Sequence, residues 1–296
     1  MLVIGLLACG ALALAGCGSG ATAANRLTVV AAENFWGSIA RQLAGSKASV
    51  TSIIVNPGTD PHSYDATPAD ARTFAAAKLA ILNGLGYDDW AAKLLAADPL
   101  AGRVTLDVGH VLGLPDGANP HQWYSPRSVE RVAAAIASGL SRLAPADRAY
   151  FRARLRAFET TALAGYHALI ARIRARYGGV AVGYSESIFQ PLGMALGLRL
   201  LTPYSFAKAI AEGTDITAAD KQAVDDQAQR HLIKVWVFNS QNVTPDVERV
   251  NQLAAAAGIP IATVTETLSP AGDSFQQWQV SELEGLERAL RRAGAG

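Results

Sequence analysis

The chain has 296 residues, half of them hydrophobic, and a formal net charge of +1 at pH 7. This content is enough for a sizeable core, and the length suits one large domain or two of ordinary size. The 26 basic residues are balanced by 25 acidic ones, and no segment interleaves basic and aromatic side chains. These features argue against nucleic acid as a partner.

An apolar run, Met1 to Ala15, opens the chain and leads into the lipobox-like segment Leu14 to Cys17. The run is shorter than the roughly 20 residues that a membrane-spanning helix needs. We therefore predict a lipoprotein signal segment over residues 1–17, although no Lys or Arg precedes the run. Cys17 is the predicted lipid attachment point of an extracytoplasmic protein, and residues 18–26 are predicted to form a flexible tether.

Residues 27–143 alternate β-branched apolar runs with helical patterns. Strands are predicted at 27–32, 50–55, 78–82 and 104–108, and helices at 35–43, from Thr67 onward, and at 126–143. This alternation is typical of parallel βα units and predicts an N-terminal βα lobe.

A single long helix is predicted over residues 144–178, where no strand pattern occurs. One apolar stripe follows steps of three and four along Phe151, Leu155, Phe158, Ala162, Tyr166, Leu169, Ile173 and Tyr177. At about 1.5 Å per residue this helix would be about 50 Å long. Its arginines are expected to solvate the outer face, namely Arg152, Arg154, Arg156, Arg172, Arg174 and Arg176.

Residues 179–296 return to the βα pattern. Strands are predicted at 180–184, 234–238 and 260–264, and helices at 191–196, 217–230, 245–257 and 281–293. The predicted fold class is therefore α/β, with two βα lobes built on parallel sheets and joined by one long rigid helix.

Two similar motifs carry the most specific chemistry in the sequence. One is Asp60-Pro61-His62-Ser63-Tyr64, and the other is Asn119-Pro120-His121-Gln122-Trp123. Proline restricts its own backbone and that of the preceding residue, so each histidine is held stiffly on a loop. A Ser/Thr-Pro pair follows each motif and is predicted to start a helix. Such a loop suits a metal ligand, while the plain alternative is two turns with incidental histidines.

Two carboxylates are predicted just beyond strand ends of the second lobe, Glu186 and Glu266. Ligands bind beyond the carboxyl ends of strands in open parallel sheets. Together with His62 and His121 they would make a shell of two nitrogens and two or more oxygens, which suits Zn(II), Mn(II) or Fe(II). The alternative for each glutamate is an acid stabilised at a helix N-terminus. Ligation requires neutral imidazole, so we expect protons to compete with metal near the ordinary histidine pKa of about 6.5.

These residues resemble those of the metal-binding lipoproteins of bacterial ABC importers, the solute-binding proteins for zinc, manganese and iron. The two histidine motifs resemble the first and second ligand motifs of that family. Ser185-Glu186 resembles the third, and Thr265-Glu266 the fourth, where many members have aspartate. The resemblance covers residues 27–292 and implies two βα lobes with the metal between them.

The resemblance also implies a function. It predicts a monomeric, non-enzymatic receptor that captures a divalent metal and delivers it to a membrane permease. The implied ligands are His62, His121, Glu186 and Glu266, oriented by Tyr64, Asn119, Trp123 and Ser185.

Manganese is favoured over zinc as the ligand, although zinc stays possible. Zinc-specific members often carry a His-rich acidic loop before the second motif, whereas residues 110–118 contain one histidine. His110, His167 and His231 are expected to serve surface or helix-end roles. Two other functions stay open: a surface adhesion lipoprotein with a metal site, and a secreted metallohydrolase.

Overall fold

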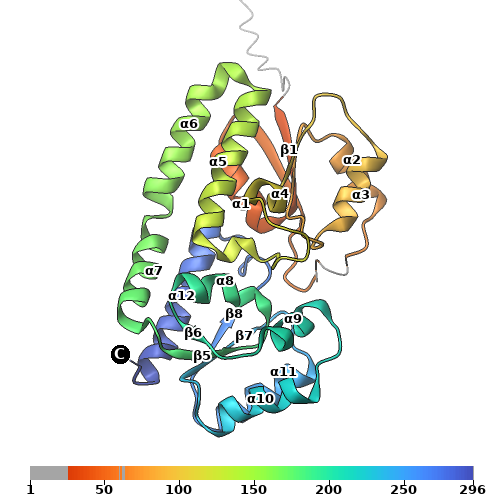
Figure 1. The fold of residues 1–296 in the computed structure, drawn as a ribbon. Coiled ribbons are helices and arrows are strands. Elements are labelled where there is room, and N and C mark those ends of the chain that lie inside the picture. The colour runs from red at the N-terminus through yellow and green to blue at the C-terminus, as the bar shows by residue number, and fades with distance from the viewer. Residues whose placement is uncertain (1–25, 60, 62–63, 296) are drawn as a thin grey trace, which may run out of the picture.

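The computed structural model describes residues 26–59, 61 and 64–295. It contains two four-stranded parallel sheets, with strand orders β2-β1-β3-β4 and β6-β5-β7-β8 (Figure 1). The predicted α/β fold class with parallel sheets is confirmed. Three predicted features lie outside the described residues: the signal segment with Cys17, most of the tether, and His62.

The first sheet is buried on both faces, because alternate residues of its strands enter two different cores. Val29 and Ala31 pack with α1 and α5, whereas Val30 and Ala32 pack with the layer of α2 and α3. This double burial explains the continuous apolar run in the first strand. The elements are β1 (Leu27–Glu33), β2 (Ala48–Ile54), β3 (Leu79–Leu82), β4 (Val104–Asp107), α1 (Asn34–Ala44), α2 (Pro68–Ala75), α3 (Asp89–Ala97), α4 (Val108–Leu112) and α5 (Pro126–Leu143).

The second sheet has the same layered arrangement. Helices α9, α10 and α11 share a core around Trp236, while α8 and α12 lie against the opposite face. Its elements are β5 (Ala181–Tyr184), β6 (Arg199–Leu200), β7 (Val235–Asn239), β8 (Ile261–Val264), α8 (Gln190–Ala195), α9 (Tyr204–Glu212), α10 (Ala218–Gln229), α11 (Pro245–Ala256) and α12 (Phe275–Arg292).

The helix starts predicted from Ser/Thr-Pro pairs are present. The Thr67 side chain accepts a hydrogen bond from the Asp70 amide, and Ser125 does the same for Ser128. Pro68 and Pro126 occupy the first helical positions. Each histidine motif is therefore followed directly by a capped helix.

The prediction of one uninterrupted helix over 144–178 is wrong. The segment consists of a 3-10 turn, η3 (Pro145–Asp147), then α6 (Arg148–Ala157), a π-helical turn, η4 (Phe158–Ala162), and α7 (Ala164–Tyr177). Leu163 N bonds to Phe158 O at 2.9 Å, across five residues instead of four. This extra residue rotates the apolar stripe, so Leu163 is fully buried in the place expected for Ala162.

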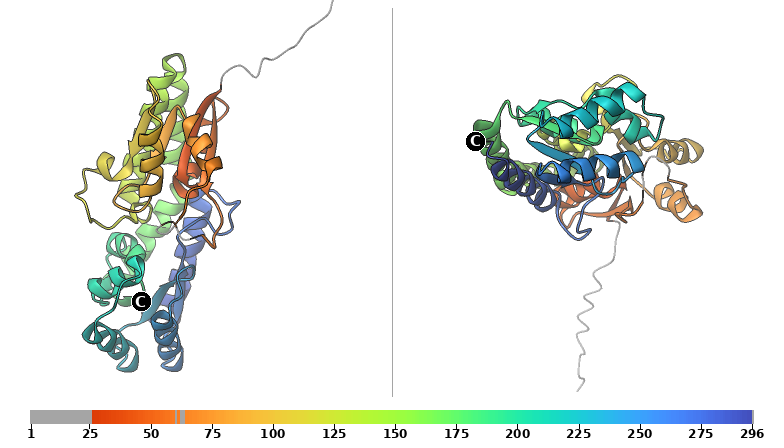
Figure 2. Two further views of the ribbon diagram at one scale, coloured as in Figure 1. Left: turned by 90° about the vertical axis from the view of Figure 1, so that its right-hand side faces the viewer. Right: turned by 90° about the horizontal axis from the view of Figure 1, so that it is seen from below.

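Helices α6 and α7 run alongside both sheets and α12 lies next to α7 (Figures 1 and 2). One hydrophobic core extends from the first sheet to the second through these helices. The start of α12 also reaches the first lobe, where Phe275 N donates to Ser38 Oγ at 2.9 Å. Among the described residues, no helix is long and apolar enough to cross a membrane.

Candidate metal centre

Three of the predicted ligands converge between the two sheets. His121 Nε2 lies 3.7 Å from Glu186 Oε1 and 3.6 Å from Glu266 Oε1. Ligand atoms of all three lie within 4.8 Å of one another, and all three residues are buried. With metal–ligand distances of about 2.0–2.2 Å, donor atoms this close can share one ion.

The sheet topology places the two carboxylates. Glu186 follows β5 closely and Glu266 follows β8, so both lie at the carboxyl edge of the second sheet. β5 pairs with both β6 and β7, which makes this edge a point where the strand order reverses. Ligands bind at such a point in open parallel sheets. Glu186 is also the N-terminal flanking residue of η5 (Ser187–Phe189), but its side chain makes no capping hydrogen bond there.

His121 is held in a defined orientation by its neighbours. Its Nδ1 lies 2.8 Å from Asn119 Oδ1 and 3.3 Å from Ser187 Oγ. A proton on Nδ1 donated to Asn119 would leave Nε2 with a lone pair that faces the carboxylates. The Trp123 ring packs edge-on against the imidazole, with centroids 5.2 Å apart.

The other predicted orienting residues have different surroundings. Tyr64 donates to Asp70 Oδ2 in α2 at 2.9 Å and packs edge-on against Trp90 in α3, so its described contacts lie in the layer of α2 and α3. Ser185 Oγ accepts a hydrogen bond of 3.1 Å from the backbone N–H of Asn239. Ser185 therefore acts on the site through Asn239.

Comparisons with known proteins decide the family. A family model described as zinc-uptake complex component A, periplasmic, matches residues 29–289. The chain belongs to this family. The manganese-binding lipoprotein MntA of Halalkalibacterium halodurans is 30% identical over 138 residues, covering 44% of this chain and 45% of that protein. The manganese ABC transporter substrate-binding lipoprotein PsaA of Streptococcus anginosus is 29% identical over 161 residues, covering 49% and 52%. The chain thus spans about half the length of these two relatives.

Solved structures of metal-binding proteins share the fold of this chain. The Mn-bound periplasmic metal-binding protein of Candidatus Liberibacter asiaticus superposes with a TM-score of 0.73 at 20% identity, over 89% of this chain and 99% of that one. FpvC of P. aeruginosa in complex with Ni²⁺ gives a TM-score of 0.72 at 21% identity, over 92% and 99%. At these identities the likeness establishes the fold alone.

Four residues next to the ligands were missed by sequence analysis. Asn239 Nδ2 donates to Glu186 Oε2 at 2.9 Å and lies 3.0 Å from Glu266 Oε1. Asn242 Nδ2 lies 3.2 Å from Glu186 Oε2, and Tyr87 OH donates to Glu266 Oε2 at 2.8 Å. Tyr87 belongs to the first lobe, so this bond crosses between lobes. The fourth is Ser187. Asn239 was detectable, because it directly follows a predicted strand.

A second layer of contacts lies behind the ligands. Tyr124 OH lies 2.6 Å from Glu282 Oε2 and 2.9 Å from Thr265 O. Glu282 Oε1 also accepts hydrogen bonds from Thr265 Oγ1 and Trp278 Nε1, each at 2.9 Å. Burial raises the pKa of Glu282 to about 8, even though these hydrogen bonds lower it.

Burial sets the protonation states of the ligands. It lowers the pKa of His121 to about 4, against a smaller opposing effect of Glu186. The pKa of His121 therefore lies below the ordinary histidine value of about 6.5. Burial, with the nearby Glu266, raises the pKa of Glu186 well above its usual range. The low pKa of the imidazole favours the neutral form that binds a cation, whereas the raised pKa of Glu186 makes protons stronger competitors for its carboxylate.

A small cavity of about 140 Å³ connects the surface to His121. The first lobe contributes Gly86 and Asn119 to its lining, and the second contributes Ser187, Tyr204 and Lys208. This cavity between the lobes is a route by which an ion can reach the three ligands.

Proposed function

We propose that this protein is the extracytoplasmic solute-binding component of a metal ABC importer. It captures one divalent transition metal between two lobes and delivers it to a membrane permease. The observation that carries this proposal is the convergence of His121 Nε2 on two buried carboxylates, at 3.6 and 3.7 Å.

The proposed ligands are His62, His121, Glu186 and Glu266. Pro61, which precedes His62, is described, and Tyr64 lines one surface pocket together with Gly86 and Tyr87. Tyr87 in turn bonds to Glu266, so Tyr64, two residues after His62 in the sequence, shares a pocket with a residue that contacts a ligand. One or two imidazoles with two carboxylates suit Zn(II) and Mn(II), and two carboxylates balance the charge of a divalent ion.

The surroundings of the ligands favour binding over hydrolysis. A metallohydrolase needs a general base beside the metal-bound water. Besides His121, the two carboxylates contact the side-chain amides of Asn239 and Asn242 and the hydroxyl of Tyr87. Amides are not bases, and burial raises the pKa of Tyr87 well above its usual range, so these three groups do not supply a general base at neutral pH. An adhesion protein with a metal site is the second alternative.

Anchoring and lobe division complete the proposal. Cys17 carries lipid at the mature N-terminus, and the lobes 27–143 and 179–296 are joined by residues 144–178. Replacing Cys17 with Ala should release the protein into the soluble fraction. A variant that stays membrane-bound at the wild-type level would exclude this anchor.

The test of the function is elemental analysis of protein purified without added metal, followed by competitive titration with zinc and manganese. We expect one bound ion per chain and no hydrolysis when zinc is added. Absence of a saturable site for any divalent metal would overturn the proposal, while turnover that depends on zinc would favour the hydrolase.

A further inference from the structure

The charges of this chain are unevenly distributed. Between Arg131 and Phe158 there are six arginines, one aspartate and no lysine or glutamate. The segment therefore has a formal charge of +5, whereas the whole chain has +1. The single aspartate, Asp147, is already paired with Lys47 at 2.8 Å.

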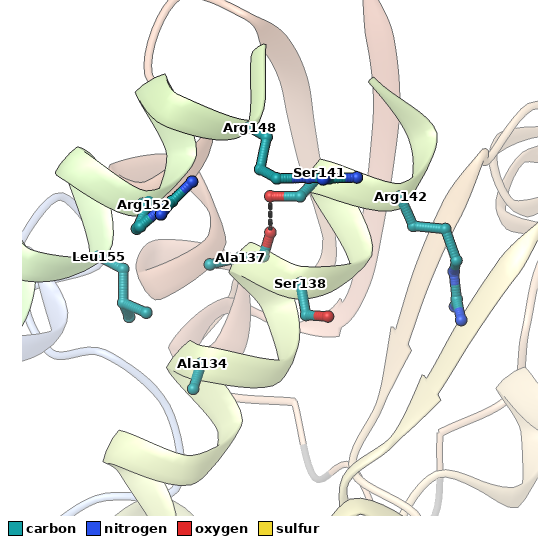
Figure 3. Close-up of a pocket in the computed structure, with 8 residues that line it drawn as sticks. All are labelled: Ala134, Ala137, Ser138, Ser141, Arg142, Arg148, Arg152 and Leu155. Atoms are coloured by element: carbon teal, nitrogen blue, oxygen red, sulfur yellow. Dashed lines mark hydrogen bonds between the residues drawn. The ribbon is translucent and has the colours of Figure 1, made fainter. Parts of the chain in front are cut away.

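A pocket of about 530 Å³ lies within this segment, between α5 and α6 (Figure 3). Arg148 and Arg152 reach from α6 toward Ser141 on α5, and Arg142 points outward on the other side of α5. We call these three arginines the basic pocket. All three are exposed, and within the described part of the chain none has a carboxylate partner. Exposed guanidinium groups without a carboxylate partner are well suited to bind phosphate oxygens.

The basic pocket lies at the end of the molecule where the tether joins the fold. Leu27 pairs with Ala48, and the adjacent Lys47 contacts Asp147 at the start of α6. Ser46 N also donates to Tyr150 OH of α6 at 3.2 Å. The start of β1 and the connection from α5 to α6 are at the same end in Figure 1. The ten residues from Cys17 to Arg26 span at most about 35 Å when extended.

The same end is remote from the metal centre. The strands of the first sheet start here and run toward the edge beyond which Tyr87 and His121 lie. A surface that bound at this end would leave the cavity leading to His121 uncovered.

We propose that the basic pocket docks on anionic lipid headgroups of the membrane that holds the protein. This proposal rests on the lipid anchor at Cys17, because the anchor keeps the pocket within reach of the bilayer. Clustered arginines near an anionic leaflet are attracted within about one Debye length, roughly 8–10 Å. Arg152, which was expected only to solvate the outer face of a helix, would thus bind headgroups together with Arg142 and Arg148.

The test uses the full chain with Cys17→Ala, so that lipid does not contribute to binding. Co-sedimentation is measured with vesicles of phosphatidylcholine, alone or mixed with phosphatidylglycerol. We expect binding to the mixed vesicles that weakens with salt. Combining Arg142→Gln, Arg148→Gln and Arg152→Gln should weaken it at least about tenfold, since each basic group near the surface adds to the attraction. Lysine at the same positions should retain binding.

The matched control removes three exposed charges from the second lobe: Arg230→Gln, Lys234→Gln and Arg292→Gln. This variant should bind the mixed vesicles like the parent protein. Equal loss in both variants would mean that total charge matters and would overturn the proposal. So would vesicle binding that the pocket variant retains, or stabilisation by inorganic phosphate without vesicle binding. The melting response to metal, measured in the same samples, separates this proposal from the proposed function, because the pocket variant should keep that response.

Discussion

The hydroxyl of Tyr124 lies 2.6 Å from Oε2 of Glu282. Tyr124 follows His121 by three residues in the first lobe, and Glu282 lies on α12, which packs against β8 of the second. Glu282 also binds Thr265, the residue before Glu266. The contact therefore fixes two ligand-bearing segments relative to each other.

Replacing Tyr124 with Phe should weaken metal binding by about tenfold, because groups that orient metal ligands typically contribute this much. Isothermal titration with zinc measures the effect. Tyr166→Phe is the matched control, since this buried tyrosine has no hydrogen-bond partner for its hydroxyl among the described residues. Unchanged affinity in Tyr124→Phe, or an equal loss in both variants, would remove Tyr124 from the account.

Asn239→Ala should also lower metal affinity by about tenfold, because its amide is the shared neighbour of Glu186 and Glu266. The control is Asn251→Ala, whose side chain accepts a hydrogen bond from Trp236 in the same lobe. Asn251→Ala should lower the melting temperature and leave affinity unchanged. If both variants bind metal like the wild type, the carboxylates do not depend on Asn239.

The sequence was sufficient to predict the features that depend on local patterns. Parallel strands follow from alternating apolar runs, and the capped helices follow from Thr67-Pro68 and Ser125-Pro126. Glu186 and Glu266 were predicted to lie near each other because the carboxyl ends of parallel strands share one edge. Their convergence with His121 depended on the resemblance as well as on this rule.

Features that depend on tertiary contacts could not be predicted. The π-helical turn before Leu163 changes the register without any proline or glycine as a signal. Tyr87 follows a short strand of the first lobe, and only the packing of the lobes brings it to Glu266. The low pKa of His121 likewise results from complete burial, which the Pro-His motif does not indicate.

Stability of the metal-free protein should fall as the pH rises. Burial raises the pKa of Asp88 to about 7 and of Glu282 to about 8. In the unfolded chain these groups titrate near 3.9 and 4.3. Between about pH 4 and pH 8 the folded state therefore binds more protons than the unfolded state. The contribution of these two carboxyl groups to the free energy of unfolding is complete below about pH 4 and is lost as the pH rises through 7 to 8.

Thermal melts from about pH 6 to about pH 8.5 measure this loss. Glu282→Gln should make the melting temperature depend less steeply on pH near pH 8. Glu284→Gln, which changes an exposed residue on the same helix, should leave that dependence unchanged. A melting temperature that rises with pH over this range would contradict the burial of these carboxyls as protonated groups. Metal binding should show the opposite trend and tighten as the pH rises, since the raised pKa of Glu186 lets protons compete with the metal for its carboxylate.

Selectivity should depend on Glu186. An imidazole at this position would add a third nitrogen, a set typical of zinc, and remove an oxygen that manganese accepts. The wild type should bind both metals, with zinc tighter. Glu186→His should widen the ratio of the two affinities by at least about tenfold, or 1.4 kcal/mol. Competition titration measures it, with Glu284→His as the exposed control. An unchanged ratio would mean that Glu186 does not contact the metal.

The most direct test of the metal centre is the rise in melting temperature that zinc or manganese causes. A ligand that binds only the folded state adds roughly 2.7 kcal/mol at a hundredfold excess over its Kd. We expect His121→Ala and His62→Ala each to remove most of the rise, while His110→Ala, His167→Ala and His231→Ala keep it. A rise that persists in His121→Ala, or that disappears in one of the three controls while His62→Ala retains it, would contradict the proposed site.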